Sequence, residues 1–140
     1  MAGNNLLALD VGEKRIGVAR ASAQARLAAP YATLKNDKYL FQLLATIIAD
    51  QQVNRVVIGL PLNSEGKDTA QTGFVRRFVD RLRDQITTIN IEFQDETLSS
   101  QRAEKELLVR KKLYEASDID ALAATYILQD YLEQHGGAAL

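Results

Sequence analysis

The stretch of residues 6–19 constrains the fold more than any other part of the chain. An apolar run leads directly into a carboxylate at Asp10, and a glycine turn with two cations then leads into a second apolar run. Buried strands are near-continuous apolar segments bounded by turn residues, so this stretch predicts a β-hairpin whose first strand ends at Asp10. An isolated buried carboxylate is unfavourable unless it is paired or bound to a metal. Asp10 therefore needs a partner from elsewhere in the chain.

The composition narrows the chemistry that is open to such a site. The 140 residues suffice for a buried core, and we expect a single domain over residues 1–140 that frays from about residue 135. The net charge of −1 gives no global attraction to nucleic acid, although a local basic cluster can still bind it. The chain has no cysteine and one histidine, which excludes disulfides, thiolate nucleophiles and sites built from several such ligands. Without a signal peptide or a membrane-length apolar run, we expect a soluble, cytoplasmic protein.

The remaining periodicity predicts an α/β order. A third strand near residues 28–34 completes an antiparallel meander, and apolar residues at helical spacing then alternate with β-rich runs. We expect strands at 53–61 and 89–93, and helices at about 38–51, from 69, from Ser99 or Ser100 through 108, and from 117. Asn36 and Asp37 are candidates for the cap of the first helix. A meander followed by α/β crossovers predicts a mixed sheet with helices on both faces.

Acidic residues stand at the edges of three apolar elements. Asp10 ends the first strand, Asp95 and Glu96 end the last one, and Asp118 and Asp120 open the final helix. If these strands are neighbours that run the same way, their ends share the sheet edge where open sheets carry their sites. Converging carboxylates with no cationic partner nearby remain ionised together only around a cation. Oxygen ligands favour Mg²⁺ or Mn²⁺ over zinc, and two such ions about 4 Å apart can promote phosphodiester hydrolysis.

Each acid taken alone also has an ordinary structural interpretation. Asp10 can form a turn, and Asp95 and Glu96 can be loop acids. Asp118 is favoured as the N-cap of the final helix, and Asp120 suits the first turn of a helix because of the helix dipole. Only their joint placement favours a metal site.

Four motifs in order make the chain resemble a known family. Residues 9–19, LDVGEKRIGVA, are similar to the opening D-x-G-x-K-R-I-G-V-A signature of the YqgF family, also called the RuvX or pre-16S rRNA nuclease family, which has the RNase H-like fold. Residues 57–63, VIGLPLN, with Gly66 resemble its G-L-P loop. Residues 95–100, DETLSS, resemble its D-E-R-L-S/T-S/T motif, and residues 119–132 resemble its closing segment. The resemblance spans essentially the whole chain.

The resemblance implies a fold and a set of site residues. The fold is an RNase H-like mixed five-stranded sheet, a three-stranded antiparallel meander plus two parallel strands, with helices on both faces. Asp10, Glu96 and Asp120 take the places of the family's metal-binding catalytic acids, and the cofactor is Mg²⁺ or Mn²⁺, with two ions. Adjacent residues at a strand end point opposite ways, so Asp95 stays open as the alternative to Glu96. Thr97 stands where the family usually has arginine.

Basic residues provide candidate contacts to a nucleic acid. Lys14 and Arg15 lie in the hairpin turn beside Asp10 and are predicted to bind the phosphate backbone, with ordinary turn charges as the alternative. A later basic stretch similar to one in the family is interpreted as a substrate-binding loop or as a solvated helix end; it consists of Arg110, Lys111 and Lys112. Further candidate contacts in the G-L-P loop are Asn63, Lys67 and Thr69.

The leading hypothesis is a metal-dependent endonuclease on structured nucleic acid. The resemblance implies processing of the 5′ end of pre-16S rRNA during bacterial ribosome biogenesis. Three alternatives stay open: a Holliday junction resolvase that acts on branched DNA as a dimer, a phosphotransferase related to actin-like ATPases, and a non-catalytic RNA-binding factor associated with ribosomes. The phosphotransferase is disfavoured because it would need two such domains. We expect a nucleic-acid partner, no membrane partner, and a monomer or a homodimer.

Overall fold

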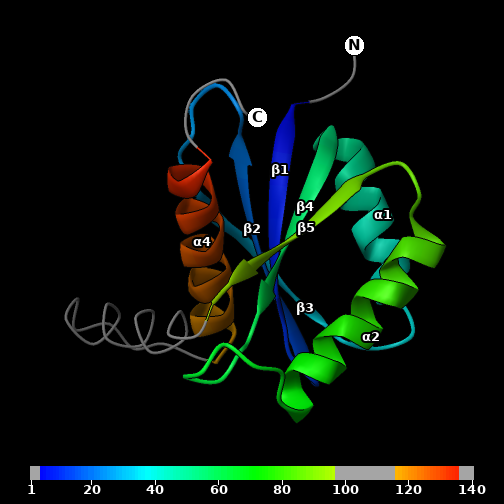
Figure 1. The fold of residues 1–140 in the computed structure, drawn as a ribbon. Coiled ribbons are helices and arrows are strands. Elements are labelled where there is room, and N and C mark those ends of the chain that lie inside the picture. The colour runs from blue at the N-terminus through cyan, green and yellow to red at the C-terminus, as the bar shows by residue number, and fades with distance from the viewer. Residues whose placement is uncertain (1–3, 97–115, 136–140) are drawn as a thin grey trace.

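The fold is built on a five-stranded sheet. The structure, a computed structural model, describes residues 4–96 and 116–135, and of residues 116–118 it describes the backbone alone. The strands are β1 (Asn5–Val11), β2 (Arg15–Ser22), β3 (Ala29–Lys35), β4 (Val53–Leu60) and β5 (Asn90–Asp95). Their order across the sheet is β3-β2-β1-β4-β5 (Figure 1). The first three strands form an antiparallel meander, whereas β4 runs parallel to β1 and β5 runs parallel to β4. The predicted mixed sheet is confirmed.

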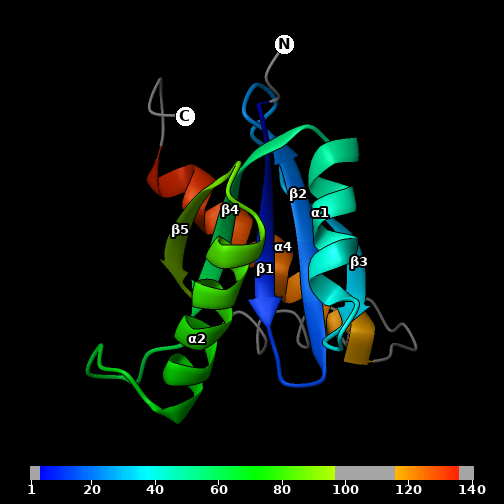
Figure 2. The same ribbon diagram turned by 90° about the vertical axis from the view of Figure 1, so that its right-hand side faces the viewer.

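Helices cover both faces of this sheet, as predicted. α1 (Leu40–Asp50) and α2 (Ala70–Gln85) lie against one face, and α4 (Ala116–Gln134) lies against the other, as Figures 1 and 2 show from two sides. The sheet separates two hydrophobic clusters, one shared with α1 and α2 and one shared with α4. Within the described ranges, no helix is long and apolar enough to cross a membrane. The helix predicted from Ser99 or Ser100 falls outside these ranges.

β1 is buried on both of its faces, which explains its continuous apolar sequence. Leu7 and Leu9 belong to the cluster beneath α1 and α2, whereas Leu6 and Ala8 belong to the cluster beneath α4. Successive side chains of a strand point to opposite faces, so Asp10 follows Leu6 and Ala8 toward α4. The alternation therefore gives Asp10 a defined side of the sheet.

α4 is held against the sheet near both of its ends. At its start, an ideal Cβ on Gly17 of β2 would lie 2.0 Å from the backbone oxygen of Asp120, so only glycine permits this approach. Near its end, the hydroxyl of buried Tyr131 accepts a hydrogen bond from Arg55 of β4 at 2.8 Å and donates one to Glu92 of β5 at 2.7 Å. These contacts fix the position of α4 over β2, β4 and β5.

Two helix starts differ from the predicted ones. α1 begins at Leu40, and Asp37 accepts a hydrogen bond from the Tyr39 backbone N–H at 2.9 Å in the preceding turn instead of capping the helix. This i→i+2 contact is the local turn that aspartate favours. α4 already includes Asp118, so the prediction of Asp118 as the N-cap residue is wrong.

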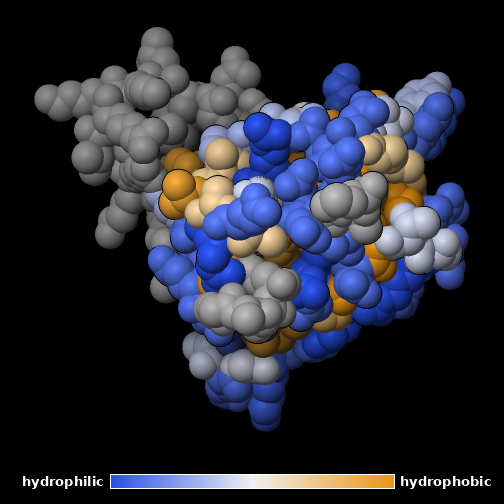
Figure 3. Space-filling model, turned by 90° about the horizontal axis from the view of Figure 1, so that it is seen from above, coloured by the Kyte–Doolittle hydropathy of each residue, from blue (hydrophilic) through white to orange (hydrophobic). Residues whose placement is uncertain are grey.

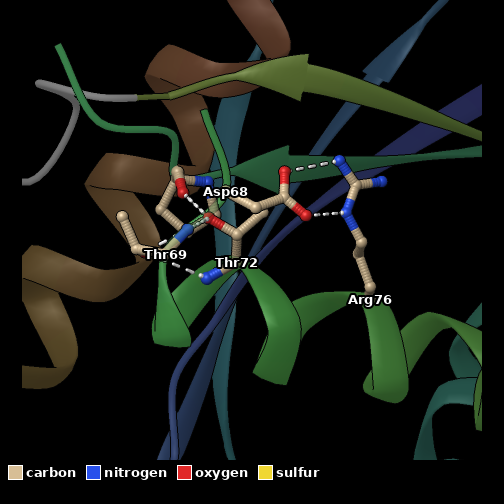
Figure 4. Close-up of polar contacts among 5 residues, drawn as sticks. Asp68, Thr69, Thr72 and Arg76 are labelled. Carbon is tan, nitrogen blue, oxygen red and sulfur yellow. Dashed lines mark hydrogen bonds and ion pairs between the residues drawn. The ribbon is translucent and has the colours of Figure 1, made fainter. Parts of the chain in front are cut away.

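The start of α2 lies where it was predicted and is tied to the preceding loop. Thr69 is the N-cap, and its backbone N–H donates to the Thr72 hydroxyl at 2.9 Å in a reciprocal capping box, in which threonine takes the usual place of glutamate or glutamine (Figure 4). Buried Thr72 also donates to the carbonyl of Pro61. Asp68 accepts two hydrogen bonds from Arg76, at 2.8 Å and 3.0 Å. The loop after β4 is therefore fastened to the first two turns of α2.

The end of the molecule at which β1 and β4 begin is largely hydrophilic. Figure 3 views this end, where apolar side chains form small separate groups. A depression of about 280 Å³ is lined here by residues that include Asn5, Arg20, Ser22 and Gln51, and the described residues of its lining include no acid.

Candidate functional site

The ends of three strands and the starts of two helices meet at one edge of the molecule. β1, β4 and β5 are neighbours that run the same way, as the prediction of a shared edge required. α2 and α4 begin at this same edge (Figures 1 and 2). Open α/β sheets bind their ligands beyond the carboxyl ends of their strands. Asp10, Asp95 and Glu96 all stand at these strand ends.

Two glycines flank Asp10 in the sheet and make room for the other acids. Gly17 is the register partner of Asp10 on β2, and on β4 Gly59 directly follows Ile58, the register partner of Leu9. The backbone of Asp120 occupies the space over Gly17. Over Gly59, an ideal Cβ would lie 2.8 Å from Cγ of Glu96. A side chain at Gly17 would displace the backbone of Asp120, and a side chain at Gly59 would meet both Ile127 and Glu96.

Glu96, rather than Asp95, lies on the side of the sheet that Asp10 faces. On β5, Phe93 packs against the cluster of α1 and α2, and Asp95 is two residues further along the same strand. Glu96 instead lies over Gly59, on the α4 face. The geometry therefore favours Glu96 for the position that the sequence left open between the two residues.

Burial and mutual repulsion perturb these acids. Burial raises the pKa of Asp10 from 3.8 to about 7, and the charge of Asp120 adds to the rise. Burial also raises the pKa of Glu96 to about 8, with further contributions from the charges of Asp10 and Asp95. Asp10 thus interacts electrostatically with acids from both of the other segments. Perturbed acids that gather at one edge indicate a functional site.

The acids suit a hard divalent cation in their chemistry, but they are not assembled around one. Carboxylate oxygens are the ligands that Mg²⁺ and Mn²⁺ prefer, and a cation would offset the repulsion that raises the pKa values of Asp10 and Glu96. In the described ranges, however, no group of three His, Cys, Asp or Glu side chains stands ready to hold a metal ion. A cation that bound these acids would have to draw the carboxylates together.

Asp120 has a cationic partner that the sequence did not reveal. Arg15 Nε donates a hydrogen bond to Asp120 Oδ2 at 2.7 Å, across 105 positions of sequence. The sequence had placed Arg15 near Asp10 as a substrate contact, and the structure pairs it with Asp120 instead. Arg15 begins β2, and strand alternation places it on the same face as Gly17, a signal that was present in the sequence. Its neighbour Lys14 is exposed in the turn.

The other predicted substrate contacts have different placements. Asn63 accepts hydrogen bonds from the backbone N–H groups of Glu65 and Lys67, at 2.9 Å and 3.0 Å, and Thr69 caps α2. These two side chains therefore shape the loop after β4. Lys67 is exposed, with its amine 3.9 Å from the Glu65 carboxylate. The predicted residues that lie outside the described ranges are Thr97, Arg110, Lys111 and Lys112.

Comparisons with known proteins agree with this architecture. The sequence profile described as "RuvX: Holliday junction resolvase" matches residues 4–134. A relative from Sulfurihydrogenibium sp., named "Putative pre-16S rRNA nuclease", is 38% identical over 132 residues, which cover 94% of this chain and 91% of the relative. A relative of the same name from Chloroflexus aggregans is 41% identical over 133 residues, which cover 91% of this chain and 92% of the relative.

Solved structures show the same fold at low sequence identity. RuvC of T. thermophilus, solved in complex with a Holliday junction substrate, superposes with a TM-score of 0.54 over 89% of this chain and 90% of that chain, at 13% identity. Thermus thermophilus RuvC in a second structure gives a TM-score of 0.53 at 12% identity. This likeness concerns the fold, whereas the profile and the relatives establish the family. The chain therefore belongs to the RuvX family of nucleases, also called the YqgF family, and has the RuvC-like RNase H fold.

Proposed function

We propose that this chain is a metal-dependent endonuclease that cleaves structured RNA, and that its substrate is the 5′ end of pre-16S rRNA. The observation that carries the proposal is the meeting of Asp10, Glu96 and Asp120 at one sheet edge, on the face that α4 covers. Metal-dependent hydrolysis of a phosphodiester needs carboxylates that hold cations beside the scissile phosphate. The names of the relatives support RNA as the substrate.

Asp10, Glu96 and Asp120 are the proposed ligands of Mg²⁺ or Mn²⁺, with two ions. When bound, such ions activate a water for attack and stabilise the charge that develops on the leaving oxygen. Asp10 is central because the other two acids lie over the glycines on either side of it. Burial disfavours the charged forms of Asp10 and Glu96, so a cation that binds them also displaces protons.

The basic hairpin turn supplies contacts to the substrate backbone. Lys14 is exposed beside the site and Arg15 reaches into it, and contacts of this kind position a nucleic acid without reading its sequence. Arg110, Lys111 and Lys112 are proposed as a second set of such contacts. On this hypothesis a single domain acts on RNA in the cytoplasm, where bacteria assemble ribosomes, as a monomer or a homodimer.

Cleavage of a precursor 16S transcript in Mg²⁺ tests this proposal. Asp10→Asn, Glu96→Gln and Asp120→Asn should each slow cleavage by about 100-fold or more, because each removes a charged ligand. Asp84→Asn, on the exposed surface of α2, is the matched control and should cleave at the wild-type rate. Cleavage that survives all three site substitutions would refute the assignment.

A four-way DNA junction is the second candidate substrate. The profile description and the RuvC complex favour testing it, and a resolvase would need a dimer that presents two sites to two strands. Faster cleavage of the junction than of the transcript, measured side by side, would support the resolvase. Tight RNA binding without cleavage under any divalent cation would support a non-catalytic ribosome-associated factor.

A further inference from the structure

The contact between Arg15 and Asp120 joins two residues with different proposed tasks. Arg15 is a candidate for binding the substrate, and Asp120 is a candidate for binding the metal. In the structure they bind each other, with Nε of Arg15 2.7 Å from Oδ2 of Asp120. Neither task can be carried out in full while this pairing occupies both side chains.

Close contacts hold the backbone on each side of this pair, and they place the two side chains within reach of each other. The backbone N–H of Gly12 donates to the carbonyl of Arg15 at 3.0 Å, and the side chain of Asn36 donates to the carbonyl of Gly12 at 2.9 Å. An ideal Cβ on Gly12 would lie 2.8 Å from the Arg15 oxygen, so the turn is tight. On the other side, the backbone of Asp120 is seated on Gly17.

The pairing uses one nitrogen of the guanidinium group. In the part of the chain that the structure describes, Nη1 and Nη2 of Arg15 make no further hydrogen bond. Arg76, by contrast, holds Asp68 through two nitrogens. The Arg15 side chain is 42% exposed, and a single-point ion pair of this exposure is weak. The two remaining nitrogens form the planar fork that suits a phosphate.

A divalent cation and Arg15 compete for Asp120. A cation held by Asp10, Glu96 and Asp120 would carry two positive charges close to the guanidinium and repel it. The absence of an assembled acidic triad in the described ranges fits this competition, because Asp120 is engaged by Arg15. Once released, Arg15 stays at the edge of the site because its backbone is fixed by the turn.

We propose that Arg15 is a metal-released phosphate contact, which pairs with Asp120 in the metal-free protein and turns to a backbone phosphate of the nucleic acid when a divalent cation binds Asp120. The inference rests on the proposed function for the identity of the two ligands. It sets an order of events, in which the cation prepares the site for the nucleic acid. Nucleic acid that binds without the cation lacks the Arg15 contact.

Calorimetric titration of Mg²⁺ into the protein without nucleic acid tests the first half of the exchange. Arg15→Ala removes the competitor and should bind Mg²⁺ about 3- to 5-fold more tightly than the wild type, the range that a half-exposed ion pair allows. Lys14→Ala is the matched control, because it removes the neighbouring cation, whose described contacts do not include Asp120. Unchanged or weaker Mg²⁺ binding by Arg15→Ala would overturn the proposal; weaker binding would make Arg15 a positioning residue for Asp120.

Binding of a 5′-fluorescein-labelled RNA hairpin, measured by anisotropy in Ca²⁺ and in EDTA, tests the second half. The dissociation constant in EDTA divided by the dissociation constant in Ca²⁺ should be about 5- to 10-fold smaller in Arg15→Ala than in the wild type. The reason is that only the wild type gains a charge-assisted phosphate contact when the cation binds. Lys14→Ala should weaken binding in both conditions and keep the wild-type ratio. Arg15→Lys keeps the charge but lacks the planar fork of the guanidinium, so its ratio should lie between those of Arg15→Ala and the wild type. A wild-type ratio in Arg15→Ala would contradict the exchange.

Neither measurement depends on cleavage. Circular dichroism spectra that match the wild type show that each variant is folded, and a denaturing gel shows that the RNA is intact. If the transcript is not cleaved but the Mg²⁺ affinity and the anisotropy ratio change as stated, the proposed nuclease function fails and the exchange stands. If cleavage occurs and Arg15→Ala behaves like the wild type in both titrations, the exchange alone fails.

Discussion

Replacing Asp10 by asparagine should stabilise the metal-free protein at neutral pH and above. Burial first, and the charge of Asp120 second, raise the pKa of Asp10 from 3.8 to about 7. A carboxyl whose pKa is higher in the folded state favours folding while it is protonated, and this contribution is fully present below about pH 4 and lost as the pH rises through about 7. Each pKa unit corresponds to about 1.4 kcal/mol, so the loss between pH 5 and pH 8 is about 3 kcal/mol. Asparagine is neutral throughout and avoids this loss.

Urea unfolding in EDTA at pH 5 and pH 8, followed by circular dichroism, measures the effect. At each pH we compare the free energy of unfolding of Asp10→Asn with that of the wild type. The difference in favour of the variant should be about 3 kcal/mol larger at pH 8 than at pH 5. Asp84→Asn controls for the removal of one exposed charge. Saturating Mg²⁺ should reduce the gain, because the cation stabilises the wild type more. An equal gain at both pH values, or a variant that is less stable at pH 8, would refute the reasoning that burial governs Asp10.

Three further predictions follow from the packing and the charges. Gly17→Ala should lower the free energy of unfolding by about 3 kcal/mol or more, because its Cβ meets the backbone of α4 at 2.0 Å. Urea unfolding should show a larger loss than in Gly66→Ala, where φ is +76° but nothing lies within 4 Å. An equal loss in the two variants would contradict the close packing. Tyr131→Phe removes two hydrogen bonds and should lower the free energy of unfolding by about 1–3 kcal/mol. The cleavage rate should stay unchanged. Slower cleavage by a variant of wild-type stability would argue against a purely structural role for Tyr131. Mg²⁺ affinity should rise between pH 6 and pH 8, because binding releases protons from Asp10 and Glu96. Calorimetry in two buffers of different ionisation enthalpy detects this release. An affinity that does not depend on pH would show that Mg²⁺ does not bind through these acids.

The strands and helices of the described ranges could be predicted because their signals are local. The uninterrupted apolar run of β1 reflects burial on both faces, and the Thr69 cap marks the start of α2. Helix starts were less reliable because a polar side chain can satisfy more than one nearby backbone group. Asp37, for example, bonds to the N–H two residues on and leaves α1 without a side-chain cap.

The candidate site was only partly predictable, because its geometry depends on contacts between distant segments. The sequence indicated Asp10, Glu96 and Asp120 through their places at element ends and through the family motifs. It left the choice between Asp95 and Glu96 open, since that choice depends on which face of β5 meets α4. It also missed the Arg15–Asp120 pair, whose members are 105 positions apart.

Local sequence patterns therefore specify where strands and helices form and which carboxylates end them, because hydrophobic periodicity and turn chemistry act over a few residues. How those carboxylates behave depends on the packing of distant segments. Gly17 and Gly59 let Asp120 and Glu96 approach Asp10, and burial then raises the pKa of Asp10. Desolvation and charge–charge interaction depend on distance and on the surrounding atoms. Both are set only when α4 packs against the sheet.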